Sequence, residues 1–403
     1  MLDVFFTIGA VLILGFITSL IFERTKVPDV IILIFVGMIF GPVLNIVSIE
    51  GPISTLAPYI GTLALIIILF DGGLNLNLFK VLTALAEAAG FTILVFILTI
   101  IFTGFTMHYI FGWAYIEGLL LGAVVGGTSS AIVIPVISKL NMSEDSKVVL
   151  TLESALTDAL CIIVAIALIE IIGLGTVNLR DTAGSLASAF STAAVTAAIF
   201  AVFWIGIINK LFIKQVRYSL TLAVVFILYS VVELIKGNGA IAVFVFALLL
   251  GNFNELAKRL KLKGEFELGT MLRAFHVEVS FFVRTFFFIF IGLMFNIEAL
   301  KSQAVLIMAG LIFLILLVAR IFGVKVLALI DKKIAPFQIY IISMMPRGLA
   351  AAVLASMPLA AGINIQYFPE IVFSIIILTN LATTFGVFII EREKSVGERI
   401  KTK

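Results

Sequence analysis

The strongest constraint on this chain is a series of long apolar segments separated by short polar connections. A helix that spans a bilayer needs about 20 mostly apolar residues. We predict thirteen such helices, the ninth of them short, at residues 4–22, 27–46, 56–76, 83–111, 114–138, 146–173, 186–212, 217–236, 239–252, 274–297, 302–329, 336–361 and 367–391. Because 62% of the residues are hydrophobic and only 13% are charged, one aqueous core cannot hide the side chains. A soluble enzyme, a disordered chain and a coiled coil are excluded, which leaves an all-α polytopic membrane protein.

The distribution of Lys and Arg sets the orientation of these helices. Most of the 27 basic residues lie in or beside the connections that follow the odd-numbered helices and in the C-terminal tail. The connections on the other side hold only Arg180, Lys236 and Lys301. Since cytoplasmic loops collect Lys and Arg, we expect a multi-pass protein of the cell inner membrane, with its N-terminus outside and its C-terminus in the cytoplasm.

Charged segments and motifs also limit the possible partners. The ninth connection is basic, and we interpret it as an orientation signal at the lipid surface rather than a nucleic-acid site. No basic region precedes the first segment, so it is expected to be a retained span and not a signal peptide. Neither GxGxxG nor GxxxxGK[ST] occurs, and residues 391–403 are expected to be a short cytoplasmic tail. No nucleotide and no nucleic acid is therefore expected as a partner.

Two predicted helices are interrupted in mid-membrane. The fifth contains GGTSS at 126–130, and the twelfth contains MMPRG at 344–348. Gly and Pro weaken a helix, and non-helical backbone at this depth persists only beside protein or a water-filled cavity. The interruptions correspond if helices 1–6 (residues 1–173) repeat as helices 8–13 (residues 217–391) with inverted orientation, joined by a linker helix at 186–212. Packing kinks are the alternative, but two at matched positions favour a secondary transporter whose site lies where the broken helices cross.

Six ionisable residues lie deep within predicted helices. A charge at the bilayer centre costs at least about 2.5–3.5 kcal/mol, so such residues face the bundle interior and find partners. The three acids and three bases suggest an internally neutralised network: Asp71, Glu153, Asp158, Arg284, Arg320 and Arg347.

The sixth helix has the strongest candidate site. Asp158 and Ser154 are four residues apart and share a face, with Thr157 beside them. Together with Thr128 and Ser129 of the interruption, they offer the hard oxygen ligands that suit a small alkali cation, whose shell water and freed carbonyls can complete. We favour ion binding over a merely satisfied buried acid for Asp158, and name Asp158, Ser154 and Thr128 as Na⁺ ligands.

The other ionisable residues have less specific roles. Glu153 points about 140° away from Asp158, and we favour a structural ion pair with an arginine over a transport role. Asp71, near the inner mouth, could be a gate, a pathway residue or an arginine partner. Arg284 is enclosed by aromatic residues and needs a carboxylate or a helix C-terminal carbonyl. His276 belongs to no metal motif and is expected at an interface.

Taken together, these residues resemble the monovalent cation:proton antiporters, in particular the NhaP-like branch. The resemblance spans essentially the whole chain, and the motif in the sixth helix is the most specific. Its carriers are FDGG at 70–73, the segment from Gly122 through Thr128, the segment from Glu153 through Asp158, Arg320, and Arg347-Gly348.

The resemblance implies that Asp158 binds the cation or the proton, that Glu153 pairs with Arg320, and that the protein is a homodimer in which one bundle moves against a scaffold. Thr157 stands where the family usually has Asn, and Ser129 where it usually has Asp, so the sequence leaves the preference between Na⁺ and K⁺ open. Electrogenic relatives carry two adjacent aspartates and a lysine in the tenth helix. With Thr157 and Arg284 instead, this chain looks like an electroneutral exchanger.

These observations predict a secondary antiporter that serves pH homeostasis by exchanging Na⁺ or Li⁺ for H⁺ by alternating access. Desolvation disfavours a buried carboxylate anion, so either ion neutralises Asp158 and lets the loaded bundle cross, which predicts one-for-one exchange without a cofactor. A K⁺/H⁺ antiporter of the same fold is the main alternative, and a cation channel is a remote one. An intramembrane enzyme is excluded because no Ser/His pair, GxGD motif or zinc cluster occurs within the spans.

Overall fold

Helices make up almost the whole described chain, because an apolar segment in hydrocarbon must satisfy its backbone N–H and C=O groups internally. A computed structural model describes residues 2–25, 29–44, 52–75, 86–138, 140–174, 179–208, 217–260, 270–293, 295, 298 and 301–401. No strand occurs in these ranges. The elements are α1 (Leu2–Thr25), α2 (Asp29–Met38), the π-helical η1 (Ile39–Val43), α3 (Pro52–Asn75), α5 (Ala86–Phe111), α6 (Tyr115–Val125), α7 (Ser130–Ser138), α8 (Glu144–Leu174), α9 (Leu179–Ile208), α10 (Arg217–Leu234), α11 (Gly239–Gly251), α12 (Phe253–Leu260), α13 (Thr270–Leu293), α15 (Gln303–Ile330), the 3₁₀ turn η3 (Ala335–Phe337), α16 (Gln338–Ser343), α17 (Leu349–Ala360) and α18 (Phe368–Lys401).

These helices fall where the thirteen apolar segments predict them, and they make the chain a multi-pass membrane protein. Seven are long and apolar enough to cross a bilayer, and shorter apolar helices lie at the remaining predicted positions. The count of thirteen spans stays a prediction, and some predicted ends, such as 83–85 and 209–212, lie outside the described residues. Two differences stand out. The amphipathic α12 forms in the basic connection where no helix is predicted, and α18 continues as helix to Lys401, past its predicted end at 391.

The described helices form two compact units. Unit 1 comprises Met1–Thr55, Ala84–Gly173 and Phe288–Lys403, and unit 2 comprises Leu56–Thr83 and Leu174–Phe287. Both interrupted helices lie in unit 1, whereas α9, α10 and α11 pack together in unit 2. The division by packing cuts across the predicted inverted repeats, which stay a prediction.

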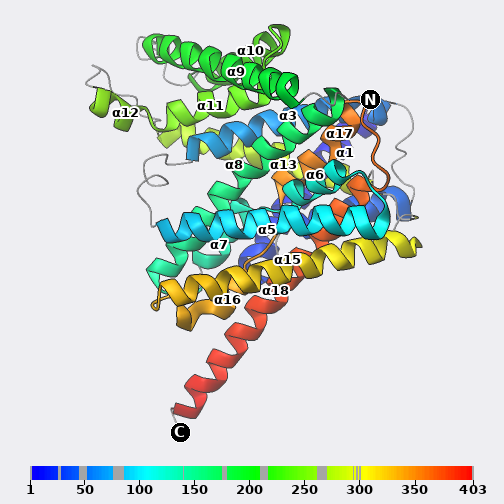
Figure 1. Cartoon of the computed structure of the whole chain (residues 1–403), viewed down its shortest axis with the longest axis vertical. Coiled ribbons are helices and arrows are strands. Elements are labelled where there is room, and N and C mark those ends of the chain that lie inside the picture. The colour runs from blue at the N-terminus through cyan, green and yellow to red at the C-terminus, as the bar shows by residue number, and fades with distance from the viewer. Residues whose placement is uncertain are drawn as a thin grey trace. The chain divides into compact units, whose positions relative to one another are not determined.

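Close backbone approach holds unit 1 together. Helix α5 lies alongside α6 and α15, and α18 packs on α15, α16 and α17 (Figure 1). A Cβ at Gly122 of α6 would lie 2.7 Å from the Cα of Ile100, and one at Gly37 of α2 would lie 2.8 Å from the Cα of Gly292. Only glycine fits such contacts. The glycines spaced four residues apart therefore serve helix packing.

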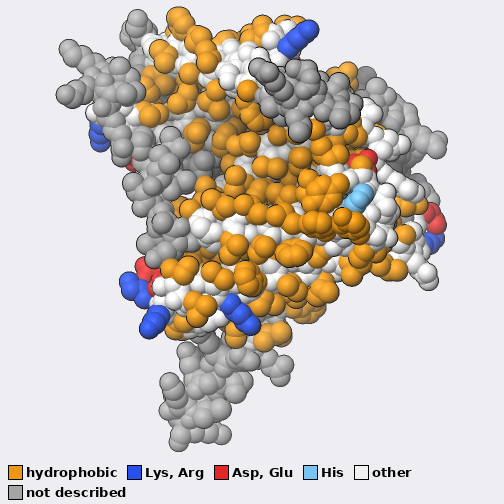
Figure 2. All heavy atoms as spheres, in the orientation of Figure 1, with side chains coloured by type: hydrophobic (Ala, Val, Ile, Leu, Met, Phe, Trp, Pro, Cys, Tyr) orange, Lys and Arg blue, Asp and Glu red, His pale blue; other side chains and the backbone are white. Residues whose placement is uncertain are grey.

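The exposed surface of α5 and α15 is apolar. On the face shown in Figure 2, hydrophobic side chains cover the region of α5 and α15. Exposed residues of these helices include Ile97, Phe102, Leu314 and Phe322. An apolar surface of this kind fits lipid and would aggregate in water.

Candidate functional site

The two interrupted helices meet at their breaks. Helix α6 ends before residues 126–129 and the chain resumes as α7, while α16 ends before residues 344–348 and the chain resumes as α17. These are the interruptions that the sequence predicts. The backbone N–H of Ser129 donates to the carbonyl of Pro346 at 2.8 Å. A Cβ at Gly348 would lie 2.6 Å from that of Ser129, so glycine is required for this approach. Each break thus provides a hydrogen-bond partner for a backbone group of the other.

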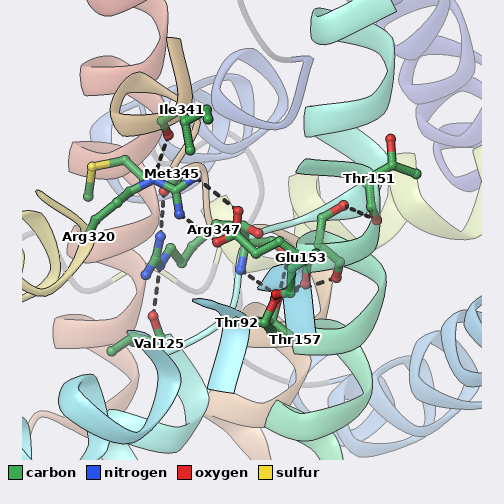
Figure 3. A network of polar contacts seen from close by, with 12 residues as sticks. Thr92, Val125, Thr151, Glu153, Thr157, Arg320, Ile341, Met345 and Arg347 are labelled. Carbon is green, nitrogen blue, oxygen red and sulfur yellow. Dashed lines mark hydrogen bonds and ion pairs between the residues drawn. The ribbon is translucent and has the colours of Figure 1, made fainter. Parts of the chain in front are cut away.

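Arg347 neutralises two of the helix ends at this crossing. Its Nε donates to the carbonyl of Val125, and Nη1 donates to the carbonyl of Met345, both at 2.7 Å (Figure 3). Val125 ends α6 and Met345 follows α16, so the buried guanidinium lies at the negative ends of two helix dipoles. The ion pairs of the described residues do not include Arg347, and its predicted ion pair stays a prediction. Its side-chain hydrogen bonds go to carbonyls freed at the helix ends.

Asp158 caps the positive end of a third half-helix. Its Oδ2 accepts from the backbone N–H of Ser130 at 3.2 Å and from the Ser130 hydroxyl at 2.6 Å. Ser130 is the first residue of α7, where a negative charge is favoured. The Asp158 side chain, which the sequence predicts to be buried, is half-buried.

Thr157 fixes the first break to α8. Its hydroxyl accepts from the backbone N–H of Thr128 at 3.0 Å and lies 2.9 Å from the carbonyl of Glu153, to which it can donate. The Thr128 hydroxyl is buried and has no hydrogen-bond partner among the described residues, which leaves its oxygen open to a cation. Ser154, one turn before Asp158, is fully buried and donates to the carbonyl of Thr151 at 3.1 Å.

Glu153 and Arg320 form a bidentate ion pair between α8 and α15. The Nη1–Oε1 distance is 2.6 Å and the Nη2–Oε2 distance is 3.1 Å, with both side chains only 2% exposed. Arg320 Nε donates to the carbonyl of Ile341 on α16 at 2.8 Å (Figure 3). The guanidinium carbon of Arg320 lies 5.9 Å from the centroid of the Phe91 ring. The pair therefore ties three helices around the crossing and is distinct from the contacts of Asp158.

Asp71 lies in unit 2, in a polar chain that sequence reasoning missed. Its Oδ1 lies 2.8 Å from Nε2 of His276, whose Nδ1 lies 2.8 Å from the hydroxyl of Tyr218. The His276 side chain, which the sequence predicts at an interface, is buried and contacts residues of unit 2. The Asp71 side chain is 46% exposed. Arg284 is half-buried on α13 in the same unit, and its predicted ion pair stays a prediction.

Sequence reasoning also missed two neutral residues of α18. The Thr379 hydroxyl accepts from the backbone N–H of Arg347 at 3.2 Å, and Asn380 Nδ2 donates to the Arg347 carbonyl at 2.7 Å. A search for ionisable residues does not find them. The available signal was an adjacent polar pair in an apolar helix that follows a break.

Known proteins share both the sequence pattern and the fold. The family profile described as sodium/hydrogen exchanger, transmembrane, matches residues 9–391. Na(+)/H(+) antiporter 1 of Methanocaldococcus jannaschii is 25% identical over 361 residues, which cover 86% of this chain and 81% of that protein. K(+)/H(+) antiporter NhaP of Alkalimonas amylolytica is 30% identical over 168 residues, 41% of this chain and 29% of that protein.

A solved structure matches the fold over nearly its whole length. The structure of the sodium proton antiporter MjNhaP1 from Methanocaldococcus jannaschii at pH 8 aligns with a TM-score of 0.75 at 23% identity, covering 96% of this chain and 95% of that one. This likeness shows the fold. Since the family profile covers almost the entire sequence, the chain belongs to the transmembrane sodium/hydrogen exchanger family.

Proposed function

We propose that the protein is a secondary antiporter that exchanges Na⁺, and also Li⁺, for H⁺, one for one, at Asp158. The observation that carries this proposal is the placement of one half-buried carboxylate on the N-terminal end of α7. The buried Thr128 hydroxyl, which has no hydrogen-bond partner among the described residues, belongs to the break that precedes this helix end. A cation bound there is held by Asp158, Thr128 and Ser154, with freed backbone carbonyls and water completing its shell.

The buried charged side chains in the described part of unit 1, namely Glu153, Arg320 and Arg347, support a single exchangeable charge at Asp158. Glu153 and Arg320 neutralise each other, and Arg347 is balanced by two helix C-terminal ends. Asp158 is then the carboxylate that changes its charge state. Since Na⁺ and H⁺ each bring one positive charge, the two half-cycles move equal charge. Because the ions compete for one carboxylate, the apparent cation affinity weakens as pH falls.

The wider architecture follows from the same proposal. Unit 1, which contains both broken helices, is the moving bundle, and unit 2 supplies the scaffold through which two copies form a homodimer. The thirteen helices form two inverted six-helix repeats, with the N-terminus outside and the C-terminus in the cytoplasm of the cell inner membrane. Exchange of Na⁺ for H⁺ then contributes to pH homeostasis.

Proteoliposomes containing a pH-sensitive dye test the function directly. Adding Na⁺ or Li⁺ to vesicles with an acidic interior should remove protons from the interior, whereas choline should not. The Asp158→Asn variant in matched vesicles corrects for proton leak. A response to K⁺ that exceeds the response to Na⁺ would instead support K⁺/H⁺ exchange, the alternative that Ser129 leaves open because it stands where the family usually has a second carboxylate. Cation flux that carries current would support a channel.

A further inference from the structure

A similar three-residue pattern, Leu-Thr followed by Asp or Asn, occurs after both breaks. Helix α8 contains Leu156-Thr157-Asp158, and α18 contains Leu378-Thr379-Asn380. Thr157 bonds to the break 29 residues before it, and Thr379 bonds to the break 32 residues before it. The Thr157-Asp158 pair and the Thr379-Asn380 pair thus occupy matching places in the chain, each on the helix that follows a broken helix.

The two threonines make equivalent hydrogen bonds. Each hydroxyl accepts a backbone N–H from its break, at 3.0 Å for Thr157 and 3.2 Å for Thr379. Each also lies within donating distance of the carbonyl four residues earlier in its own helix, at 2.9 Å and 2.7 Å respectively. A hydroxyl can accept and donate at once, so each threonine ties a break to an intact helix.

The residues that follow the two threonines have opposite kinds of hydrogen-bond partner. Asp158 faces donors, the N–H and hydroxyl of Ser130, which favour an anion. Asn380 Nδ2 faces two acceptors, the carbonyls of Arg347 and Ile376, both at 2.7 Å. Asn380 is fully buried, and its Oδ1 has no hydrogen-bond partner in the described chain. Position 380 therefore requires an N–H donor, and two carbonyl oxygens would repel a carboxylate anion there.

Hydrogen bonds and two short stretches of covalent backbone connect Asn380 with Asp158. Asn380 holds the carbonyl of Arg347, the preceding carbonyl of Pro346 accepts from Ser129 N–H, and the next residue, Ser130, binds the Asp158 carboxylate. Displacing the second break would thus displace the donors that hold Asp158.

We propose that Thr379 and Asn380 are the second-repeat counterparts of Thr157 and Asp158, and that Asn380 is a positioning residue that holds the second break against Ser129 and so shapes the cation site without adding a charge. The proposal rests on the proposed cation site at Asp158. It explains why only one of the two matching positions carries a carboxylate.

The first test is Asn380→Ala, with Ser374→Ala as the matched control. Ser374 is a buried polar residue of the same helix whose hydroxyl donates only to the carbonyl of Glu370 within that helix. In proteoliposomes, we expect Asn380→Ala to raise the KM for Na⁺ about tenfold, the effect of losing one or two hydrogen bonds, with a smaller change in maximal rate. Ser374→Ala should leave the KM unchanged. An unchanged KM in Asn380→Ala, with only yield or maximal rate reduced, would overturn the positioning role.

The second test is Asn380→Asp, which keeps the shape of the side chain. The protonated acid can donate to the Arg347 carbonyl, whereas the anion cannot. We expect the ratio of variant to wild-type exchange to be near one at the acidic end of the measurable range and to fall steadily as pH rises. A ratio that is already low at the acidic end, or that rises with pH, would contradict the requirement for a donor at position 380. This variant also serves if Asn380→Ala does not fold.

A binding measurement separates this proposal from the proposed function. Na⁺ is titrated into the detergent-solubilised wild type, Asn380→Ala and Ser374→Ala, and the unfolding temperature is followed, since a ligand of the folded state raises it. Weaker Na⁺ stabilisation of Asn380→Ala than of Ser374→Ala supports the positioning role, even if the wild type moves no protons. Equal stabilisation of both variants contradicts the positioning role. Absence of cation-driven proton movement in the wild type would contradict the proposed function alone.

Discussion

Two acidic residues, Asp158 in unit 1 and Asp71 in unit 2, lie in contrasting surroundings. Ser130 holds Asp158 with a backbone N–H and a hydroxyl, neither of which changes its charge. Asp71 is held by the side chain of His276 on α13. Asp158 is thus held at the first residue of a half-helix that follows a break, whereas Asp71 is held from within a continuous helix. This contrast supports the proposal that transport uses Asp158, the acid that lies at a break.

The largest expected effect is that of Asp158→Asn. The amide oxygen of Asn can still accept from Ser130, so the cap of α7 and the fold should survive, while the exchangeable charge is lost. Cation-driven proton movement in proteoliposomes should vanish, with an unfolding temperature close to that of the wild type. Exchange near the wild-type rate would contradict the single-carboxylate mechanism.

Glu153→Gln should affect stability more than transport. It leaves the Arg320 guanidinium buried without its anion, and breaking a buried pair in this way costs about 3–5 kcal/mol in soluble proteins. We expect a lower unfolding temperature and yield, with residual exchange per folded molecule. Replacing both partners, as Glu153→Gln with Arg320→Met, should restore part of the stability because no unpaired charge remains. A stable but inactive Glu153→Gln protein would make Glu153 a transport residue.

A moderate effect is expected from His276→Gln, which tests the other side of the comparison. Gln can still donate a hydrogen bond to Asp71, and the net loss should not exceed the roughly 0.5–1.5 kcal/mol of one hydrogen bond, so exchange should fall by less than about tenfold. Ser280→Ala is the matched control, since the Ser280 hydroxyl lies 3.4 Å from the same His276 nitrogen. Proton movement in the dye assay gives both rates. If Asp71→Asn abolished exchange as fully as Asp158→Asn, unit 2 would hold a second essential carboxylate and the contrast between the acids would fail.

The sequence predicts what depends on segment length and local composition. Apolar length locates the helices, and Gly and Pro at 126–130 and 344–348 locate both breaks. The pairing of Glu153 with Arg320 follows from the resemblance to known antiporters. The partners of Arg347 could not be predicted, because backbone carbonyls at helix ends leave no trace in residue type.

Contacts between residues that lie far apart in the sequence could not be predicted either. Asp71 and His276 are 205 residues apart, and His276 and Tyr218 are 58 apart, so no spacing rule connects them. Asn380 is uncharged, so the cost of burying a charge, which identifies the ionisable candidates, does not identify Asn380. Its role becomes visible only when the breaks are seen to share one hydrogen-bond network.

The smallest effect is expected from the membrane potential, which should not change the rate of net exchange at all. With one carboxylate at the crossing, Asp158 carries either one cation or one proton, so both half-cycles move equal charge. The test imposes a K⁺/valinomycin potential on proteoliposomes while an outward Na⁺ gradient drives proton uptake, after K⁺ has been checked as a substrate. Thr157→Asp sharpens the measurement, because Asp can still accept the Thr128 N–H while it adds a second carboxylate beside Asp158. Its rate should depend on potential where the wild-type rate does not. A steep dependence in the wild type would mean that a second proton carrier exists, and Asp71 with its His276 partner would be the first residue to examine.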